Sequence, residues 1–417
     1  MVRIFTIAIA LGLAAQAQEI PADLLARFRT QIRQTLQALP DYTCIQTVAR
    51  SRRESPRAPL QNMDTLRLQV GLINKKEHYT WPDAKQFDDR ELRDLVGRGI
   101  IGTGNFAAHV QHVFLSPHTQ FTPKQVEDRS GRRAVRYDYE VPVEFSNYKL
   151  RVPPDESEVG VRGAFWVDLE TLDLLRLEVH ADEIAPELKI ARLDETIDYK
   201  RTDIGETSFL LPSASELLLT SLNDEVHRNL TSFSACRQYR AESTVTYLSE
   251  EKEAPAAASD VPSSLPAYLK VELALDNDID PEKAVVGDPV RALVIRPAKE
   301  GERVLVPEGA AVIGRLVRLE KAAQPFPHYV VGLEFHTLEI GSSKIDFSAT
   351  MQDAGPASGL LKQQKRMDPV FTRKRNMRFD ILVREKPRGE GVLHWDAKNP
   401  RIKRGLKMRW ITGGAEE

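Results

Sequence analysis

Apolar and polar residues alternate with a period of two through residues 163–179, on both sides of a short polar turn. The apolar positions are Phe165, Val167, Leu175, Leu177 and Val179. This pattern predicts a half-buried antiparallel β-hairpin. Pairing of the two arms should also bring Asp168 and Arg176 to one face, within reach of a cross-strand contact.

The chain before this hairpin opens with a helical pattern between Asp23 and Pro40. Its apolar residues are Leu24, Leu25, Phe28, Ile32, Leu36 and Leu39. Shorter helical patterns cover residues 88–96 and 106–114. One helix packed on a long, strongly curved antiparallel sheet, an open half-barrel, is the architecture that this order predicts.

The strands of that sheet follow from alternating apolar residues bounded by turn residues. Outside the hairpin we expect them at 42–50, 64–73, 78–81, 134–141, 147–152, 190–199, 208–219 and 232–247. The fold class is therefore mainly β, with an N-terminal helix.

Residues 250–266 are charged at first and then rich in Ala, Pro and Ser, which is typical of a linker. Short strand patterns between turn signals follow through residues 267–413 and predict a small C-terminal β-barrel. A chain of this length exceeds the ~250–300 residues at which a single core stops growing. We therefore expect two domains, at 18–249 and 267–413, joined by an exposed hinge.

Residues 1–17 have the pattern of a signal peptide, with Arg3, an apolar run from Ile4 to Ala14 and a small-residue cleavage site. The apolar run is shorter than the ~20 residues that a spanning helix needs. We expect an exported, periplasmic protein that is soluble after cleavage.

The sequence contains 2 cysteines, Cys44 and Cys236. In an exported protein a small, even number favours a disulfide. Such a bridge would tie the first strand of the sheet to its last strand. Two free, buried thiols are the alternative.

A net charge of −2 conceals a basic C-terminal region, because residues 362–409 carry 16 Lys and Arg against 5 Asp and Glu. Its central cations are Lys365, Arg366, Arg373, Lys374, Arg375 and Arg378. Such a segment can contact an anionic membrane surface, and a solvated loop at about 353–390 within the second domain is the alternative. Export argues against a nucleic-acid partner.

Three groups of residues invite a chemical interpretation. His109, His112 and His118 suggest a metal site, but i to i+3 spacing alone favours surface or capping histidines. Acidic residues on the strands after residue 120 suggest paired catalytic carboxylates, although interleaved arginines favour a solvated face. These acids are Asp128, Asp138, Glu140 and Glu144. Asn229-Leu-Thr231 matches a glycosylation acceptor.

The N-terminal region, over about residues 20–250, resembles the lipoprotein-carrier superfamily of LolA and LolB. The resemblance rests on the first helix followed by Tyr42-Thr-Cys, on the Phe165-Trp-Val-Asp hairpin, and on Asp198-Tyr-Lys with Phe209-Leu-Leu-Pro212. It implies an unclosed barrel whose apolar concave face holds acyl chains or a segment of a partner.

The C-terminal region resembles the small β-barrel of TrbI-type conjugation-channel proteins. The residues that carry this likeness are Val286-Gly-Asp-Pro-Val-Arg-Ala and Val306 to Leu316. Gly309 would serve a turn, and Gly314 a close approach of two backbones.

We interpret the sequence as an exported, non-catalytic envelope protein without metal or cofactor. The leading hypothesis is binding of a lipid or lipoprotein acyl chain by the half-barrel, with the five apolar hairpin residues as ligand contacts. A structural or assembly scaffold that binds a partner protein is the alternative, and a hydrolase is the least favoured.

Overall fold

The structure of the protein is a computed structural model. It describes residues 20–82, 84, 87, 92–96, 99–102, 108–152, 154–239, 264–322, 326–361 and 389–413. The predicted signal peptide and residues 250–263 of the predicted linker lie outside the described residues. So do the six cations proposed for membrane contact, Lys365, Arg366, Arg373, Lys374, Arg375 and Arg378.

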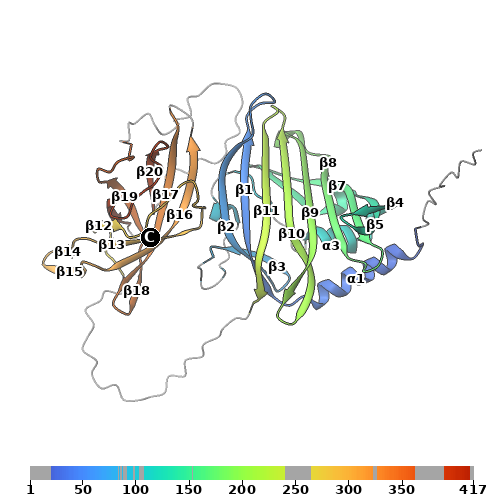
Figure 1. Ribbon diagram of the computed structural model, residues 1–417, viewed down its shortest axis with the longest axis horizontal. Coiled ribbons are helices and arrows are strands. Elements are labelled where there is room, and N and C mark those ends of the chain that lie inside the picture. Colours follow the sequence, from blue (N-terminus) through green and yellow to red (C-terminus); the bar gives the residue numbers. More distant parts are fainter. Residues whose placement is uncertain are drawn as a thin grey trace, which may run out of the picture.

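The N-terminal region forms an 11-stranded antiparallel sheet with the order β3-β2-β1-β11-β10-β9-β8-β7-β5-β4, and β6 pairs with β7. Figure 1 shows this sheet curving through the right half of the molecule. The strands are β1 (Tyr42–Arg53), β2 (Gln61–Ile73), β3 (Lys76–Thr80), β4 (Gln120–Arg129), β5 (Arg132–Val141), β6 (Tyr148–Val152), β7 (Asp155–Asp168), β8 (Leu174–Asp182), β9 (Ile190–Ile204), β10 (Thr207–Ser221) and β11 (Val226–Gln238). The predicted hairpin is β7 and β8.

Helices cover one face of this sheet, which we call the helix-covered face. They are α1 (Leu24–Ala38), α2 (Leu92–Val96), α3 (Ala108–Leu115), α4 (Val143–Ser146) and a 3₁₀ turn (Pro186–Leu188). Leu24, Phe28 and Ile32 follow one another at four-residue spacing on α1, and all three are buried. The predicted arrangement of one long helix on a curved antiparallel sheet is therefore confirmed.

The C-terminal region forms an 8-stranded sheet with the order β18-β17-β16-β13-β12-β21-β19, and β20 pairs with β17. The strands are β12 (Lys270–Leu275), β13 (Pro289–Val294), β16 (Ala311–Ala322), β17 (His328–Ile340), β18 (Ser343–Asp346), β19 (Ala349–Ala354), β20 (Glu390–Asp396) and β21 (Lys407–Thr412). β14 (Ala298–Glu300) and β15 (Arg303–Val306) form a separate hairpin. The Gly389 N–H donates to Thr350 Oγ1 at 3.2 Å and brings β20 next to β19, so the sheet curls into a small barrel.

Both glycines singled out in this barrel have the predicted roles. Gly309 has φ +83 in the turn before β16. A Cβ at Gly314 would collide with the carbonyl oxygen of Glu334 on the neighbouring strand β17, so only glycine allows this approach. The resemblance to TrbI-type barrels stays a prediction.

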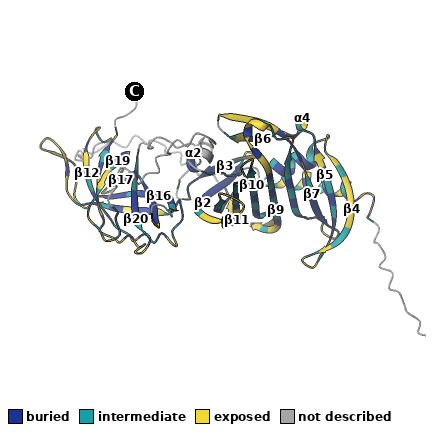
Figure 2. Ribbon diagram, turned by 90° about the horizontal axis from the view of Figure 1, so that it is seen from above, coloured by how far each residue is buried: buried dark blue, intermediate teal, exposed yellow. Residues whose placement is uncertain are grey.

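The buried side chains form two large clusters, and Figure 2 shows their strands in dark blue. One cluster lies between α1, α3 and strands β5 to β9. The other extends from β1, β2 and β3 of the half-barrel into the C-terminal barrel. The edge strand β4 is mostly exposed in comparison.

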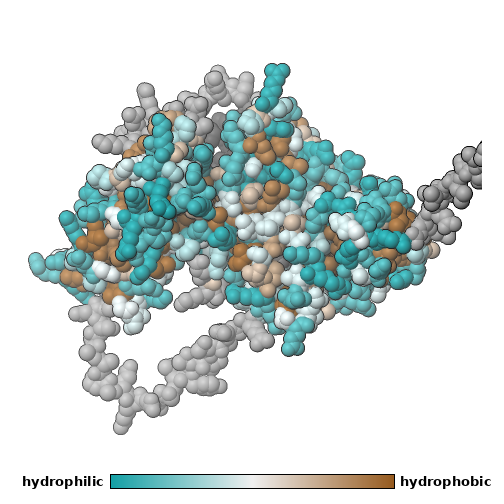
Figure 3. Space-filling view, in the orientation of Figure 1, coloured by the Kyte–Doolittle hydropathy of each residue, from teal (hydrophilic) through white to brown (hydrophobic). Residues whose placement is uncertain are grey.

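On the face drawn in Figure 3, apolar residues are interspersed with polar ones. Among the described residues the most exposed large apolar side chains are Tyr268 (80%), shortly before β12, and Leu222 (63%), in the turn after β10. In the described part of the chain no helix has the length and apolar character needed to cross a membrane.

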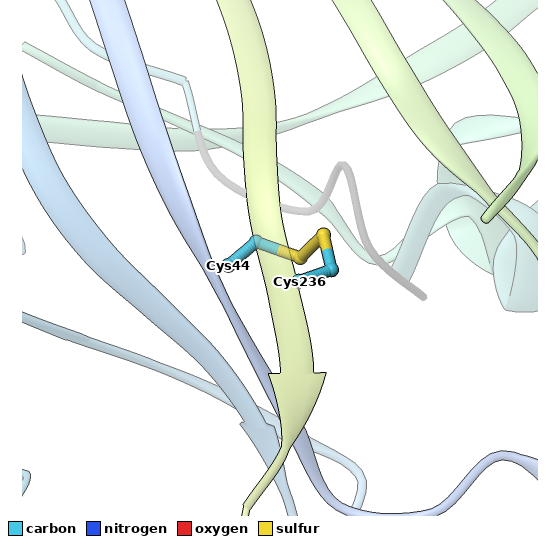
Figure 4. Close-up of a disulfide and its surroundings, with 2 residues drawn as sticks. All are labelled: Cys44 and Cys236. Atoms are coloured by element: carbon cyan, nitrogen blue, oxygen red, sulfur yellow. A yellow bond between two sulfur atoms is a disulfide. The ribbon is translucent and has the colours of Figure 1, made fainter. Parts of the chain in front are cut away.

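Cys44 on β1 and Cys236 on β11 form a disulfide, with Cα atoms 4.0 Å apart (Figure 4). The two strands pair side by side, and a register shift opposite Cys44 places Ala235 and Cys236 across from this one residue. Both cysteines are used in the bridge. The predicted link between the first and the last strand of the half-barrel is confirmed.

Candidate functional site: the groove beside helix α1

Four of the five proposed ligand contacts lie on the helix-covered face and are completely buried. They are Phe165, Val167, Leu177 and Val179, each 0% exposed. The ring of Phe28 on α1 stacks on Phe165 with centroids 5.6 Å apart, and Phe114 on α3 meets the same ring edge-on at 4.8 Å. The protein's own side chains thus fill the space that the sequence assigned to a ligand.

Leu175 lies on the opposite face of the sheet from the other four residues. The partner of Trp166 is Arg176, whereas the partner of Val167 is Leu174, so Leu175 is an extra residue in β8. Such a β-bulge interrupts the alternation of faces. Leu175 packs there against Ala134, Ala164 and Trp166. The prediction that Leu175 and Leu177 share one face was therefore wrong.

The predicted contact between Asp168 and Arg176 was also wrong. The Arg176 guanidinium donates to both carboxylate oxygens of Asp198 on β9, at 2.6 and 2.8 Å. Asp168 instead accepts from Arg132 on β5, at 2.7 Å. The bulge separates Asp168 from Arg176. Asp168 therefore pairs with a residue of β5, and Arg176 with a residue of β9.

An open groove of about 250 Å³ lies beside the second half of α1. Its walls include Ile32, Thr35, Ala38, Leu172, Phe209 and Leu210. The last buried residue of α1 is Ile32, six residues before the exposed Ala38. The apolar face of the sheet is therefore partly accessible beside this end of the helix.

The turn between β7 and β8 forms one rim of the groove and has a fixed conformation. Leu172 has φ 58, in the left-handed region that residues other than glycine seldom adopt. The Asp168 carboxylate accepts the backbone N–H groups of Glu170 and Thr171 at 2.9 and 2.8 Å. These bonds, together with the one from the Leu172 N–H to the Asp168 carbonyl oxygen at 3.0 Å, hold Leu172 against the groove.

Ion pairs neutralise the charges at this rim. Asp173 is 3% exposed and accepts from Arg201 at 2.8 and 3.1 Å and from Arg132 at 3.2 Å. Arg132 also binds Asp168. Two cations meet two anions, so the charges at this rim balance.

Burial alone would raise the pKa of Asp168, but its hydrogen bonds outweigh this effect. The N–H groups of Thr171 and Glu170 and the Arg132 guanidinium all stabilise the carboxylate, so the pKa lies below its ordinary value. Asp168 is consequently ionised at neutral pH and keeps the turn in place.

The three histidines do not form a common site. His109 is 4% exposed and its Nε2 lies 3.1 Å from Glu195 Oε2 on β9, inside the half-barrel. Burial, and the neighbouring His109, lower the pKa of His112. His118 stacks on Phe145 with centroids 3.7 Å apart. The expectation of a surface or capping histidine was wrong for His109, which is a buried residue paired with a carboxylate.

The acidic residues proposed as an alternative lie on a solvated face. Asp138 pairs with Lys124 and Arg136 at 3.2 and 3.1 Å, and Asp128, Glu140 and Glu144 are exposed. Within the described ranges no three His, Cys, Asp or Glu side chains are grouped to hold a metal ion.

Asn229 is a structural residue of the helix-covered face. It is 4% exposed, and its Nδ2 donates to the carbonyl oxygen of Ile100 at 2.8 Å. Its side chain is therefore inaccessible for glycosylation in the folded protein.

No protein-family model matches the chain, and no curated protein matches it either. Among solved structures, a DUF1329 family protein from Desulfovibrio piger is similar over 54% of this chain and 95% of its own, with 13% identity and a TM-score of 0.29. A LolA superfamily protein from Nitrosomonas europaea is similar over 52% of this chain and 94% of its own (9% identity, TM-score 0.28). A putative outer membrane lipoprotein-sorting protein domain from Vibrio parahaemolyticus is similar over 51% and 90% (10% identity, TM-score 0.27).

These neighbours include the superfamily that the sequence resembles, and they extend over about half of this chain. What establishes the fold is the chain's own topology, one helix on an open, curved antiparallel sheet.

Sequence patterns alone did not indicate the groove. The turn at 168–173 carries a local signal, because an Asp that opens a short polar segment, here Asp168-Leu-Glu-Thr-Leu-Asp173, is typical of a side-chain-capped turn. Nothing in the sequence shows that Arg132, Asp173 and Arg201 meet, since they come from three different strands or turns.

Proposed function

We propose that this protein is an exported, non-catalytic binding protein of the cell envelope. In this proposal the half-barrel takes an apolar chain of a lipid or lipoprotein in the groove beside α1. One observation carries it: the open groove beside the second half of α1 has an apolar part, formed by residues such as Ile32, Leu172 and Leu210, next to polar residues that include Gln34 and Ser208. Its volume of about 250 Å³ lies just below the ~300–1,000 Å³ of small-molecule pockets, which suits a slender chain.

The disulfide supports the exported location. Disulfides persist in oxidising compartments and are rare in the cytosol. The bridge between Cys44 and Cys236 joins two neighbouring interior strands of the sheet, β1 and β11. Contact of the basic segment at 362–388 with an anionic membrane remains a separate prediction.

A scaffold that binds a partner protein is the second candidate function. The observation that favours it is the packed interior, where Phe28, Phe114 and Phe165 contact one another. A half-barrel that is filled by its own side chains needs no ligand to be stable. The groove then has no role in binding, so blocking it separates the two candidates.

Replacing Ala38 by tryptophan should block the groove without unfolding the protein. Ala38 is an exposed residue of α1 that lines the groove, so a large ring at this position occupies the proposed ligand space. We expect the affinity for a dansyl-labelled undecanoic acid, measured by fluorescence titration, to fall about tenfold or more, which corresponds to about 1.4 kcal/mol.

The control is Ala26→Trp, because Ala26 is an exposed residue of the same helix that does not line the groove. This variant should bind the probe like the wild type. Equal affinities of the wild type and A38W would exclude the groove as the binding site. A wild type that binds no probe, and that carries no lipid in native mass spectrometry, would favour the scaffold.

A further inference from the structure

The C-terminal barrel contacts the half-barrel through a short segment before β13. Strand β3 pairs with β2 at residues 69–73, and further along the same strand Val286 of the barrel pairs with Leu66 in a parallel bridge. The Arg67 N–H donates to the Val286 carbonyl oxygen, and the Val286 N–H donates to the Thr65 carbonyl oxygen, each at 2.8 Å. The barrel segment thus continues the hydrogen bonding along the edge of β2, past the point where the pairing with β3 ends.

Side chains on both sides reinforce this backbone pairing. Arg67 Nη1 binds Asp288 Oδ1 at 2.7 Å, and the other oxygen of Asp288 accepts the Val285 N–H at 2.9 Å. The Arg315 guanidinium on β16 lies over the ring of Trp81, 5.5 Å from its centroid. Asp288 therefore binds its own loop and the half-barrel at the same time.

Gly287 is required at the centre of the contact for two independent reasons. Its φ of +103 is strained for any residue with a side chain, and a Cβ would lie 2.5 Å from the Arg67 carbonyl oxygen and 3.0 Å from the Trp81 ring. The Gly287 N–H also donates to Leu316 on β16 at 2.8 Å. The segment is hence anchored in the barrel and shaped to fit the half-barrel.

We propose that Val285–Asp288 is an intramolecular lock that holds the half-barrel and the barrel together as one rigid body. The second large apolar cluster supports this, since it contains Leu66 and Trp81 of the half-barrel together with Val286 and Val290 of the barrel. The proposal departs from the exposed hinge predicted at 250–266. It goes beyond the proposed function, because no barrel residue lines the groove beside α1.

The lock has two consequences. It covers part of the free edge of β2, and an exposed strand edge is prone to pair with other chains. It also fixes the barrel at the β2 side of the sheet (Figure 1), so any surface of the barrel has a constant position relative to the groove. A ligand in the groove and a partner on the barrel would then be held at a fixed distance.

Small-angle scattering of the full chain tests the lock with a pair of glycine variants. Gly287→Ala places a side chain at a strained φ and also drives its Cβ into the Arg67 carbonyl oxygen. Gly405→Ala introduces only the strained φ, here +89, because no heavy atom lies within 4 Å of the added Cβ. We expect a larger radius of gyration and two separate thermal transitions for G287A. G405A should stay as compact as the wild type and keep its coincident unfolding.

A charge variant keeps the proposal testable if G287A fails to fold. Arg67→Asp sets a carboxylate against Asp288, while Arg67→Lys retains the positive charge; the Arg67 side chain is 44% exposed, so neither variant disturbs a core. R67D should expand the molecule and R67K should not. The lock is refuted if R67D scatters like the wild type, or if the wild type itself is extended with two independent transitions.

Discussion

Val167→Asp and Leu177→Asp are each expected to unfold the half-barrel. Both side chains are 0% exposed and belong to the apolar cluster beneath α1 and α3. Burying an unpaired carboxylate is among the most destabilising substitutions, with losses of about 4–5 kcal/mol or more. This is a large part of the ~5–15 kcal/mol by which domains are stable. Urea denaturation followed by circular dichroism measures the loss.

The matched control is Leu230→Asp on β11. Leu230 is an exposed apolar side chain (42%) on the opposite face of the same sheet, so its replacement removes the same groups without burying a charge. We expect a change below about 1 kcal/mol, part of it from Glu216 directly across on β10. If the V167D and L177D variants fold and lose only the binding of the probe, the prediction is wrong and Val167 and Leu177 contact the ligand.

Removal of the disulfide is expected to have a similarly large effect. Cys44 and Cys236 are 192 residues apart in sequence, so the bridge restricts nearly the whole unfolded half-barrel. In the chain-entropy description a closed loop of this length contributes about 5 kcal/mol. The Cys44→Ala/Cys236→Ala double variant should lose stability of this order in urea denaturation.

A reductant provides the internal control for this prediction. Dithiothreitol should lower the midpoint of the wild type to that of the double variant, and should leave the double variant unchanged. A double variant that is as stable as the oxidised wild type would show that the pairing of β1 with β11, and not the covalent link, closes the sheet.

Local sequence patterns determined most of the secondary structure. The helix at Leu24–Ala38 follows from apolar residues spaced for one face, and the hairpin of β7 and β8 from alternation with a period of two. The disulfide was predictable as well, because a chain with two cysteines has one possible pair. The roles of Gly309 and Gly314 were also predictable, since a turn with positive φ favours glycine and a close approach of two backbones leaves no room for a side chain.

The register of the sheet lay beyond those patterns. The bulge at Leu175 moves this residue to the other face, and it redirects Arg176 to Asp198 and Asp168 to Arg132. A single inserted residue changes every pairing past it. Alternation of apolar residues defines a strand but does not show where an extra residue is inserted.

The groove and the contact between the half-barrel and the C-terminal barrel depend on residues that are distant in sequence. Asp173 and Arg201 meet at the rim only because β8 and β9 are neighbours, and Arg67 meets Asp288 across 221 positions. The sequence by itself determined which segments are helices and strands, because those depend on neighbours within a few residues. Only the tertiary structure decided which faces are filled, where a groove stays open and how the domains join, because these depend on how separate elements pack.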